Sequence, residues 1–122
     1  MRNISVAITE PQILAESKDV TRRLGWADLQ PGTLLQPVRK GQGLKKGEKV
    51  HTVGRPIKVV SVRRERLSRL LKDDAYAREE LRREGFPQLT PEQFVRMFCE
   101  ANGCRPSAWV TRIEFEFVLE AP

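Results

Sequence analysis

Alternation of apolar and polar residues predicts strands near both ends of the chain. In residues 4–8, Ile4, Val6 and Ile8 share one side. In residues 109–119 the period of two is longer: one face is apolar, and the other carries Arg112, Glu114 and Glu116. The β-branched residues of 57–62 predict a central strand, and a shorter strand is expected at 33–35.

Helical spacing and capping residues predict helices between these strands. Thr9 and Gln12 have the spacing of a capping box, so a short helix is expected from Thr9 to about Ser17. The leucines at 67, 70 and 71 fall on one helical stripe, which predicts a helix over residues 63–72.

Two further helices have clear start and stop signals. Asp73 or Asp74 can cap a helix that runs to Arg83, with Gly85 behind it, and a capping box at residues 90–93 opens a helix that stops before Gly103. Strands at both ends with helices between them predict one mixed α+β domain over residues 1–122. We expect it to be built on a small mixed or antiparallel β-barrel with flanking helices.

The composition is basic. The 122 residues include 22 Lys and Arg against 16 Asp and Glu, which gives a formal net charge of +6. A basic surface attracts polyanions such as nucleic acid, although many small proteins are basic without binding one. No apolar stretch is long enough for a membrane span and no secretory signal is visible, so we expect a cytoplasmic protein without a membrane partner.

The inventory of metal-binding residues is small. Cys99, Cys104 and the single histidine, His51, are too few for a four-ligand zinc site, and we expect reduced cysteines and no metal or organic cofactor.

A cationic cluster with one hydroxyl is the strongest functional signal. Lys18, Thr21, Arg22 and Arg23 lie within six residues, just after the predicted first helix. If they converge, they suit an anionic ligand such as a nucleic-acid backbone, because guanidinium groups bind phosphate bidentately. The same groups suit a second chemistry, in which the lysine activates the hydroxyl.

Other residues extend the binding hypothesis. Trp26 is a candidate for stacking on an unpaired base, or else a half-buried hydrophobic residue that covers one end of the barrel. Lys45 and Lys46 lie in a glycine-rich basic loop that extends the positive charge. Its glycine spacing matches neither the P-loop nor the dinucleotide fingerprint, and a hairpin connection is the alternative.

With this layout, the chain resembles the ASCH family of the PUA-like superfamily. That family's signature is G-x-K-x-x-T-x-R, and Lys18, Thr21 and Arg23 match it, with Glu16 at the usual glycine. The resemblance continues through 84–87, 90–94 and 110–115 and so covers nearly the whole chain.

The resemblance implies a small β-barrel with a cleft lined by the signature. ASCH domains are generally inferred to bind RNA or other nucleic acid. Small members resemble either an amidohydrolase of N4-acetylcytidine or a ribonuclease. By the same resemblance, Thr21 is the nucleophile, Lys18 its base and Glu84 the acid; otherwise Glu84 is a surface carboxylate at a helix end. Glu16 either weakens phosphate binding or pairs with Lys18.

Three hypotheses follow. The first is a domain that binds RNA, other nucleic acid or a nucleoside through Lys18, Arg22, Arg23 and the residues named above. The second is an enzyme that removes the acyl group from a modified nucleoside, or a small ribonuclease that needs a divalent ion. The third is a protein-interaction module whose basic helix face, around Arg66 and Arg69, docks an acidic partner; the sequence names no such protein.

Overall fold

The computed structural model describes residues 1–40 and 46–119. Five strands form one sheet in the order β1-β3-β4-β5-β2. Their bounds are β1 Arg2–Ser5, β2 Val20–Arg23, β3 Leu34–Val38, β4 Ile57–Arg66 and β5 Trp109–Phe117. Strands β1 and β3 are parallel and the other pairs are antiparallel, so the sheet is mixed.

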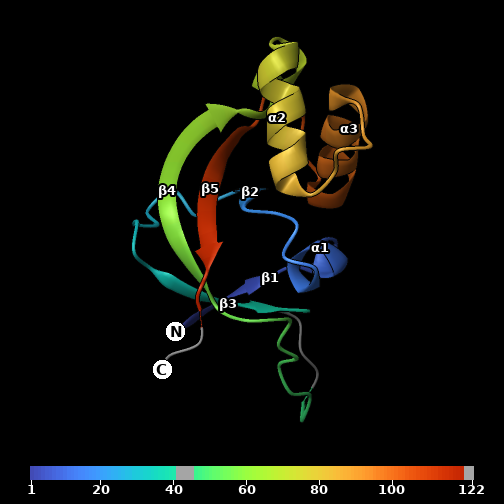
Figure 1. Cartoon of the computed structure of the whole chain (residues 1–122). Helices are drawn as coiled ribbons and strands as arrows, with labels where there is room; N and C mark the ends of the chain where they lie inside the picture. Colours follow the sequence, from blue (N-terminus) through green and yellow to red (C-terminus); the bar gives the residue numbers. More distant parts are fainter. Residues whose placement is uncertain (41–45, 120–122) are drawn as a thin grey trace.

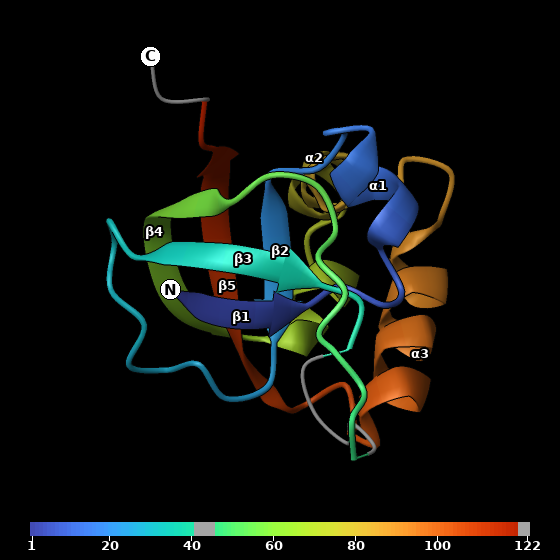
Figure 2. The ribbon, with the colours of Figure 1, turned by 90° about the horizontal axis from the view of Figure 1, so that it is seen from below.

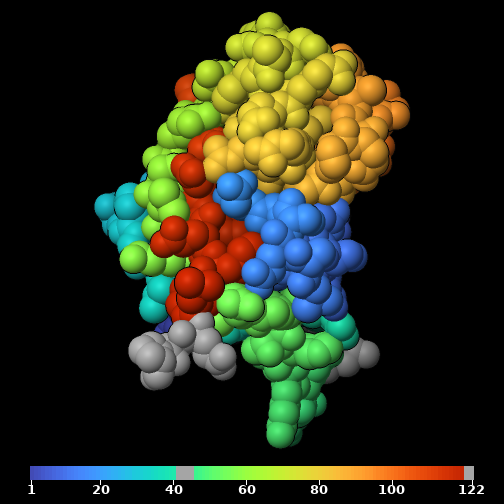
Figure 3. Space-filling model, viewed as in Figure 1, coloured from blue at the N-terminus to red at the C-terminus, as the bar shows by residue number. Residues whose placement is uncertain are grey.

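Helices α2 Asp74–Glu84 and α3 Pro91–Asn102 lie at one end of the long β4–β5 pair, and α1 Glu10–Leu14 lies apart from them, nearer β1 (Figure 1). The short 3₁₀ helix η1 Leu67–Leu71 follows β4 and packs against α2 and α3. Figure 3 shows the N-terminal residues, in blue, packed between these helices and the loop before β4, in green. None of the described helices is long and apolar enough to cross a membrane.

The capping signals of α2 and α3 are confirmed. The Asp73 side chain accepts a hydrogen bond from the Tyr76 backbone N–H, and α2 ends at Gly85, whose φ is +91°. Thr90 and Gln93 form the predicted capping box of α3, which ends at Gly103. Both helices end where glycine adopts the left-handed conformation without strain.

The helix predicted over residues 63–72 is wrong. Strand β4 continues through Arg66 and pairs with β5 as far as the Arg66–Trp109 pair, so only Leu67–Leu71 are helical, as the 3₁₀ helix η1. Pairing with β5 outweighs the local helical stripe, because it satisfies the backbone groups of both strands. Leu67 and Leu70 are buried as predicted, whereas Leu71 is 41% exposed.

The N-terminal elements are shorter than predicted. Strand β1 ends at Ser5, and Ile8 is 55% exposed. Helix α1 ends at Leu14, and Thr9 makes no capping hydrogen bond through its side chain. Gln12 donates to the Gly85 carbonyl at 3.3 Å instead, so a tertiary contact has replaced the predicted capping box.

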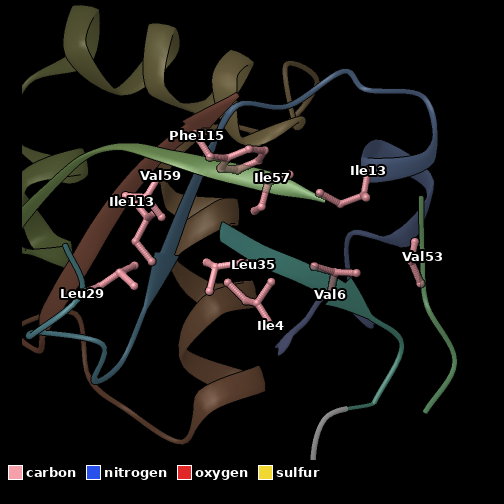
Figure 4. Close-up of a cluster of buried hydrophobic side chains, with 10 residues drawn as sticks. All are labelled: Ile4, Val6, Ile13, Leu29, Leu35, Val53, Ile57, Val59, Ile113 and Phe115. Carbon is pink, nitrogen blue, oxygen red and sulfur yellow. The ribbon is translucent and has the colours of Figure 1, made fainter. Parts of the chain in front are cut away.

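Two apolar clusters lie apart in the molecule. The first is formed by residues from the sheet, α1 and the connecting segments: Ile4, Val6, Ile13, Leu29, Leu35, Val53, Ile57, Val59, Ile113 and Phe115 (Figure 4). The second lies among η1, α2, α3 and the start of β5: Leu67, Leu70, Ala77, Leu81, Phe86, Phe94, Val95, Phe98 and Val110.

The mixed α+β class is confirmed, but a closed barrel is not. Strands β1 and β2 end the sheet order, and in the described ranges they do not pair with each other. A single side chain links these two edges, because Arg23 Nη1 donates to the Ser5 carbonyl at 2.5 Å. Figure 2, seen from below, shows β1 and β2 within one strongly curved sheet.

Candidate functional site

A cleft of about 300 Å³ lies where the β1–α1 connection, β2, the end of α2 and α3 meet. It is lined by Lys18, Thr21, Arg22, Arg23 and Glu84, so the structure brings together the residues of the basic cluster and the carboxylate implied by the resemblance. Thr21 and Arg23 alternate with Arg22 along β2, and this alternation turns Arg22 toward the helices.

Lys18 lies in the connection between α1 and β2, which is firmly held. Asp19 donates its backbone N–H to the Arg83 carbonyl at 2.9 Å, and its carboxylate accepts two hydrogen bonds from the Arg83 guanidinium at 3.0 and 3.1 Å. On the other side, the Asp19 carbonyl accepts from the backbone N–H of Phe115 at 2.9 Å. Lys18 is therefore fixed between the end of α2 and the sheet.

The Lys18 ammonium is buried, and only 3% of the residue is exposed. Its Nζ lies 3.5 Å from Glu84 Oε1. Burial lowers the pKa of Lys18 to about 8; the Glu84 carboxylate opposes this change, and the positive charge of Arg23 adds to it. Lys18 can thus lose its proton near neutral pH, as a general base must.

The Thr21 hydroxyl is oriented by its neighbour. Thr21 is 5% exposed, and its Oγ1 accepts a hydrogen bond from Arg23 Nε at 3.1 Å. The guanidinium occupies an acceptor site of the oxygen and leaves the hydroxyl proton for another acceptor. Burial lowers the pKa of Arg23, with Glu84 opposing that change.

Arg22 was predicted to contact phosphate, but the structure buries its side chain. The residue is 3% exposed, and its guanidinium is surrounded by acceptors. They are Glu84 Oε2 at 3.0 Å, Glu65 Oε2 at 3.3 Å, Tyr76 Oη at 3.1 Å and Glu80 Oε1 at 2.5 Å. Burial alone would lower the pKa of Arg22, but the three carboxylates outweigh it and raise that pKa.

Glu84 joins this charged network to the cleft. It is 3% exposed, so it is a buried group and not a surface carboxylate. One oxygen accepts from Arg22 and the other faces Lys18. The carboxylate is thereby held between a permanent cation and one that can lose its proton.

Glu80 and Arg112 are part of the network and were not predicted. Arg112 was assigned to the wet face of the last strand, yet it is 3% exposed and donates from Nη2 to Glu80 Oε2 at 3.0 Å. Burial acts to raise the pKa of Glu80, but hydrogen bonds from Arg112 and Arg22 lower it to about 2. The spacing of Glu80 and Glu84 on one face of α2 was the signal available in the sequence.

The opposite wall of the cleft is apolar. Phe94, Met97 and Phe98 of α3 line it together with Phe86 and Val6. Phe94 and Phe98 are buried, but their helix also borders the cleft, and its amphipathic pattern alone does not distinguish core residues from residues that line a cleft.

Some predicted binding residues lie elsewhere. Trp26 is half-buried against the apolar core of the sheet, with the Arg2 guanidinium 3.9 Å from its ring centre. Lys46 is exposed and does not line the cleft, and Lys45 lies outside the described residues.

Glu16 pairs with Arg55 at 2.7 Å and not with Lys18. Its φ is +53°, in the left-handed region that glycine adopts most readily, which explains why glycine suits this position of the motif. The basic helix face expected at Arg66 and Arg69 is absent from the described ranges. Arg66 lies in β4 over the Trp109 ring, whereas Arg69 lies in η1 over the Tyr76 ring.

The described residues contain no group of three or more His, Cys, Asp and Glu side chains arranged to hold a metal ion. Cys99 and Cys104 are free thiols with their sulfur atoms 3.8 Å apart.

No family model and no curated protein match the sequence. Two crystal structures are similar. The hypothetical protein PH0355 has a TM-score of 0.59 and 18% identity, with 96% of each chain covered. Protein EF3133 from Enterococcus faecalis V583, of family DUF984, has a TM-score of 0.55 and 13% identity, with 91% of this chain and 70% of that chain covered. At such identities the likeness shows a shared fold alone.

Proposed function

We propose that the cleft binds one N-acylated nucleoside, of the N4-acetylcytidine type, and hydrolyses its amide. The observation that carries this proposal is the meeting of a buried lysine, a hydroxyl and a carboxylate in one cleft. We also assign the chain to the ASCH family of the PUA-like superfamily. Support comes from the match of Lys18, Thr21 and Arg23 to the signature and from the fold shared with a DUF984 protein, since DUF984 is ASCH-like.

The volume of the cleft favours a single base. Ligand pockets typically measure about 300–1,000 Å³, so a cleft of about 300 Å³ is at the small end of that range. Lys18 and Arg22 are held by carboxylates, so they are poorly placed to contact a run of phosphates. Binding of a strand within the cleft, and cleavage of its backbone, are therefore less well supported than amide hydrolysis.

In the proposed reaction, neutral Lys18 accepts the proton of Thr21 while the Thr21 oxygen attacks the amide carbonyl. The carbon–nitrogen bond then breaks, and the departing amine takes a proton from the Lys18–Glu84 pair. Water hydrolyses the ester on Thr21, releasing the carboxylic acid and restoring the hydroxyl. Arg23 already donates to Thr21, so its positive charge lies beside the reacting groups, where the amide oxygen becomes negative during the attack.

Release of acetate from N4-acetylcytidine tests this proposal. Thr21→Ala should abolish turnover, while the far-ultraviolet circular dichroism and the melting temperature stay close to those of the parent. Thr21→Ser keeps the hydroxyl and should retain measurable activity. Absence of turnover on a panel of acylated nucleosides, or full activity in Thr21→Ala, would contradict the hydrolase.

The pH profile gives a second test. Lys18 acts as a base only when neutral, and its pKa is about 8, so kcat/KM should rise from pH 6.5 and level off above about pH 9. Lys18→Arg keeps the positive charge but cannot lose it, so activity should be lost at every pH. A rate that falls as the pH rises through 8 would rule out Lys18 as the base.

A further inference from the structure

Several exposed arginines form no ion pair, whereas the arginines of α2 are all paired with carboxylates. In residues 1–40 and 46–119 these unpaired arginines are Arg2, Arg64, Arg66, Arg96 and Arg105, and two of them lie over tryptophan rings. The Arg2 guanidinium lies 3.9 Å from the centre of the Trp26 ring, and that of Arg66 lies 4.5 Å from the Trp109 ring. These five residues, Arg2, Trp26, Arg64, Arg66 and Trp109, are called the arginine–tryptophan surface below.

Strand register brings the surface together. Arg64 pairs with Thr111 and Arg66 pairs with Trp109, and directly paired residues project from the same face of a sheet. Thr111 Oγ1 accepts from Arg64 Nη1 at 3.0 Å and donates to the Gly25 carbonyl. That hydrogen bond fixes the segment containing Trp26 against the same face.

The same register connects this surface with the cleft. Thr111 pairs with Arg23 on its other side, so Arg23, Thr111 and Arg64 form one row across β2, β5 and β4. Arg23 also lines the cleft. The row thus places the exposed Arg64 near the cleft, with the buried Thr111 between Arg64 and Arg23.

The two tryptophans are unusual for a small protein surface. Trp109 is 49% exposed. Trp26 has φ of +57°, which is rare and costly for a bulky side chain and is found most often at functional sites. The one acidic residue between Arg64 and Arg66, Glu65, is buried on the other face and bonded to Arg22. The surface therefore combines uncompensated positive charge with aromatic rings.

We propose that the arginine–tryptophan surface binds a single-stranded nucleic acid and presents one of its bases to the cleft. Unpaired bases stack on tryptophan, and arginine binds phosphate and also stacks on bases. An acidic peptide would use the charge alone, whereas a base can also stack on the exposed Trp109 side chain. The presentation of a base rests on the proposed function, whereas binding of the strand does not.

Binding is tested with a fluorescein-labelled oligocytidine RNA by anisotropy at low and at moderate salt. Trp109→Ala should weaken binding about tenfold, in line with the loss of one stacked base. Arg66→Gln should weaken it and reduce the dependence of affinity on salt. Arg78→Gln makes the same charge change on the exposed side of α2, where Arg78 pairs with Asp74, and should leave the affinity nearly unchanged.

Equal affinity for parent, Trp109→Ala and Arg66→Gln would overturn the proposal. So would a loss in Arg78→Gln as large as that in Arg66→Gln, because affinity would then depend only on net charge. Polyglutamate that competes as well as RNA, with no effect of Trp109→Ala, would assign the surface to an acidic protein.

Kinetic measurements on two substrates distinguish this proposal from the proposed hydrolase activity. Trp109→Ala should leave hydrolysis of free N4-acetylcytidine unchanged and raise KM about tenfold for the same base in an oligonucleotide. If the protein is not a hydrolase, the parent will turn over neither the free nucleoside nor the oligonucleotide, while the RNA affinities will still be as predicted. Tight RNA binding with an unchanged KM on the oligonucleotide would show that the strand does not lead to the cleft.

Discussion

The two faces of β5 support different parts of the molecule. Ile113 and Phe115 point into the apolar core of the sheet, whereas Arg112 points toward α2 and into the charged network. The apolar core is formed by hydrophobic side chains, with Lys18 and Arg23 at its border. The network reaches the cleft, because Glu84 belongs to both. One strand thus carries apolar residues on one face and a member of the charged network on the other.

The energetics of the two regions differ in kind. An apolar core is stabilised by the area that it removes from water, and losing one methylene has a modest cost. A buried ion network is costly to desolvate, and removal of one partner leaves an uncompensated charge. Substitutions in each region therefore test this contrast.

Glu80→Ala should have the largest effect. Glu80 accepts from both Arg22 and Arg112, so its loss leaves two buried guanidinium groups short of a partner and should lower the free energy of unfolding by about 3–5 kcal/mol. Urea unfolding at pH 7 measures this cost. The control is Glu79→Ala, which removes an exposed pair with Arg82 and should cost less than about 1 kcal/mol.

The dependence of the stability on pH gives a second test of the Glu80 carboxylate. The pKa of Glu80 is lowered to about 2 in the folded protein, so its stabilising contribution is present above pH 4.5 and is lost as the pH falls toward 2. The difference in stability between parent and Glu80→Ala should therefore shrink over that interval. A constant difference would mean that its charge does not stabilise the fold.

Gly85→Ala should have an intermediate effect at the junction between the network and the cleft. A Cβ there would lie 2.6 Å from Gln12 Cγ and 3.3 Å from Lys18 Cβ, and φ is +91°. We expect a loss of about 1–3 kcal/mol and a lower rate of hydrolysis, because Lys18 is displaced. Gly103→Ala is the matched control: φ is +62° and no atom lies within 4 Å, so only the backbone cost applies and the rate should not change.

Ile113→Val should have the smallest effect. It removes one buried methylene from the apolar core and should cost about 0.5–1.5 kcal/mol in urea unfolding. Because Ile113 itself does not line a pocket with Lys18, the pH profile of hydrolysis should be the same as in the parent. A shifted profile would show that the apolar core also sets the pKa of Lys18, and the contrast between the two regions would be lost.

Local signals in the sequence predict the helices better than the strand ends. The ends of α2 and α3 follow from Asp73, Thr90 and their glycines, which act within one turn. Residues 63–66 look helical beside the leucines, but their state depends on β5, more than forty residues later. Pairing between distant segments is not encoded in a short window, so the strand at residues 63–66 could not be predicted from its own residues.

The candidate site shows the same limit. Lys18, Thr21 and Arg23 were predicted together because the motif places them within six residues, and the structure puts them in one cleft. Glu84 came from the resemblance. Arg112 was placed on the solvent-exposed face because a charged residue in an alternating strand normally faces water. Its partner Glu80 lies thirty-two residues away, so the sequence gives no direct sign of the pair.

The Arg23 hydrogen bond to the Ser5 carbonyl bears on how the protein avoids aggregation. An open sheet leaves two outer strands whose free backbone groups can recruit another molecule, and natural proteins protect such borders. Here a cation that lines the cleft occupies one of those backbone acceptors. The same side chain thus serves ligand recognition and colloidal stability, so selection for either one constrains the other.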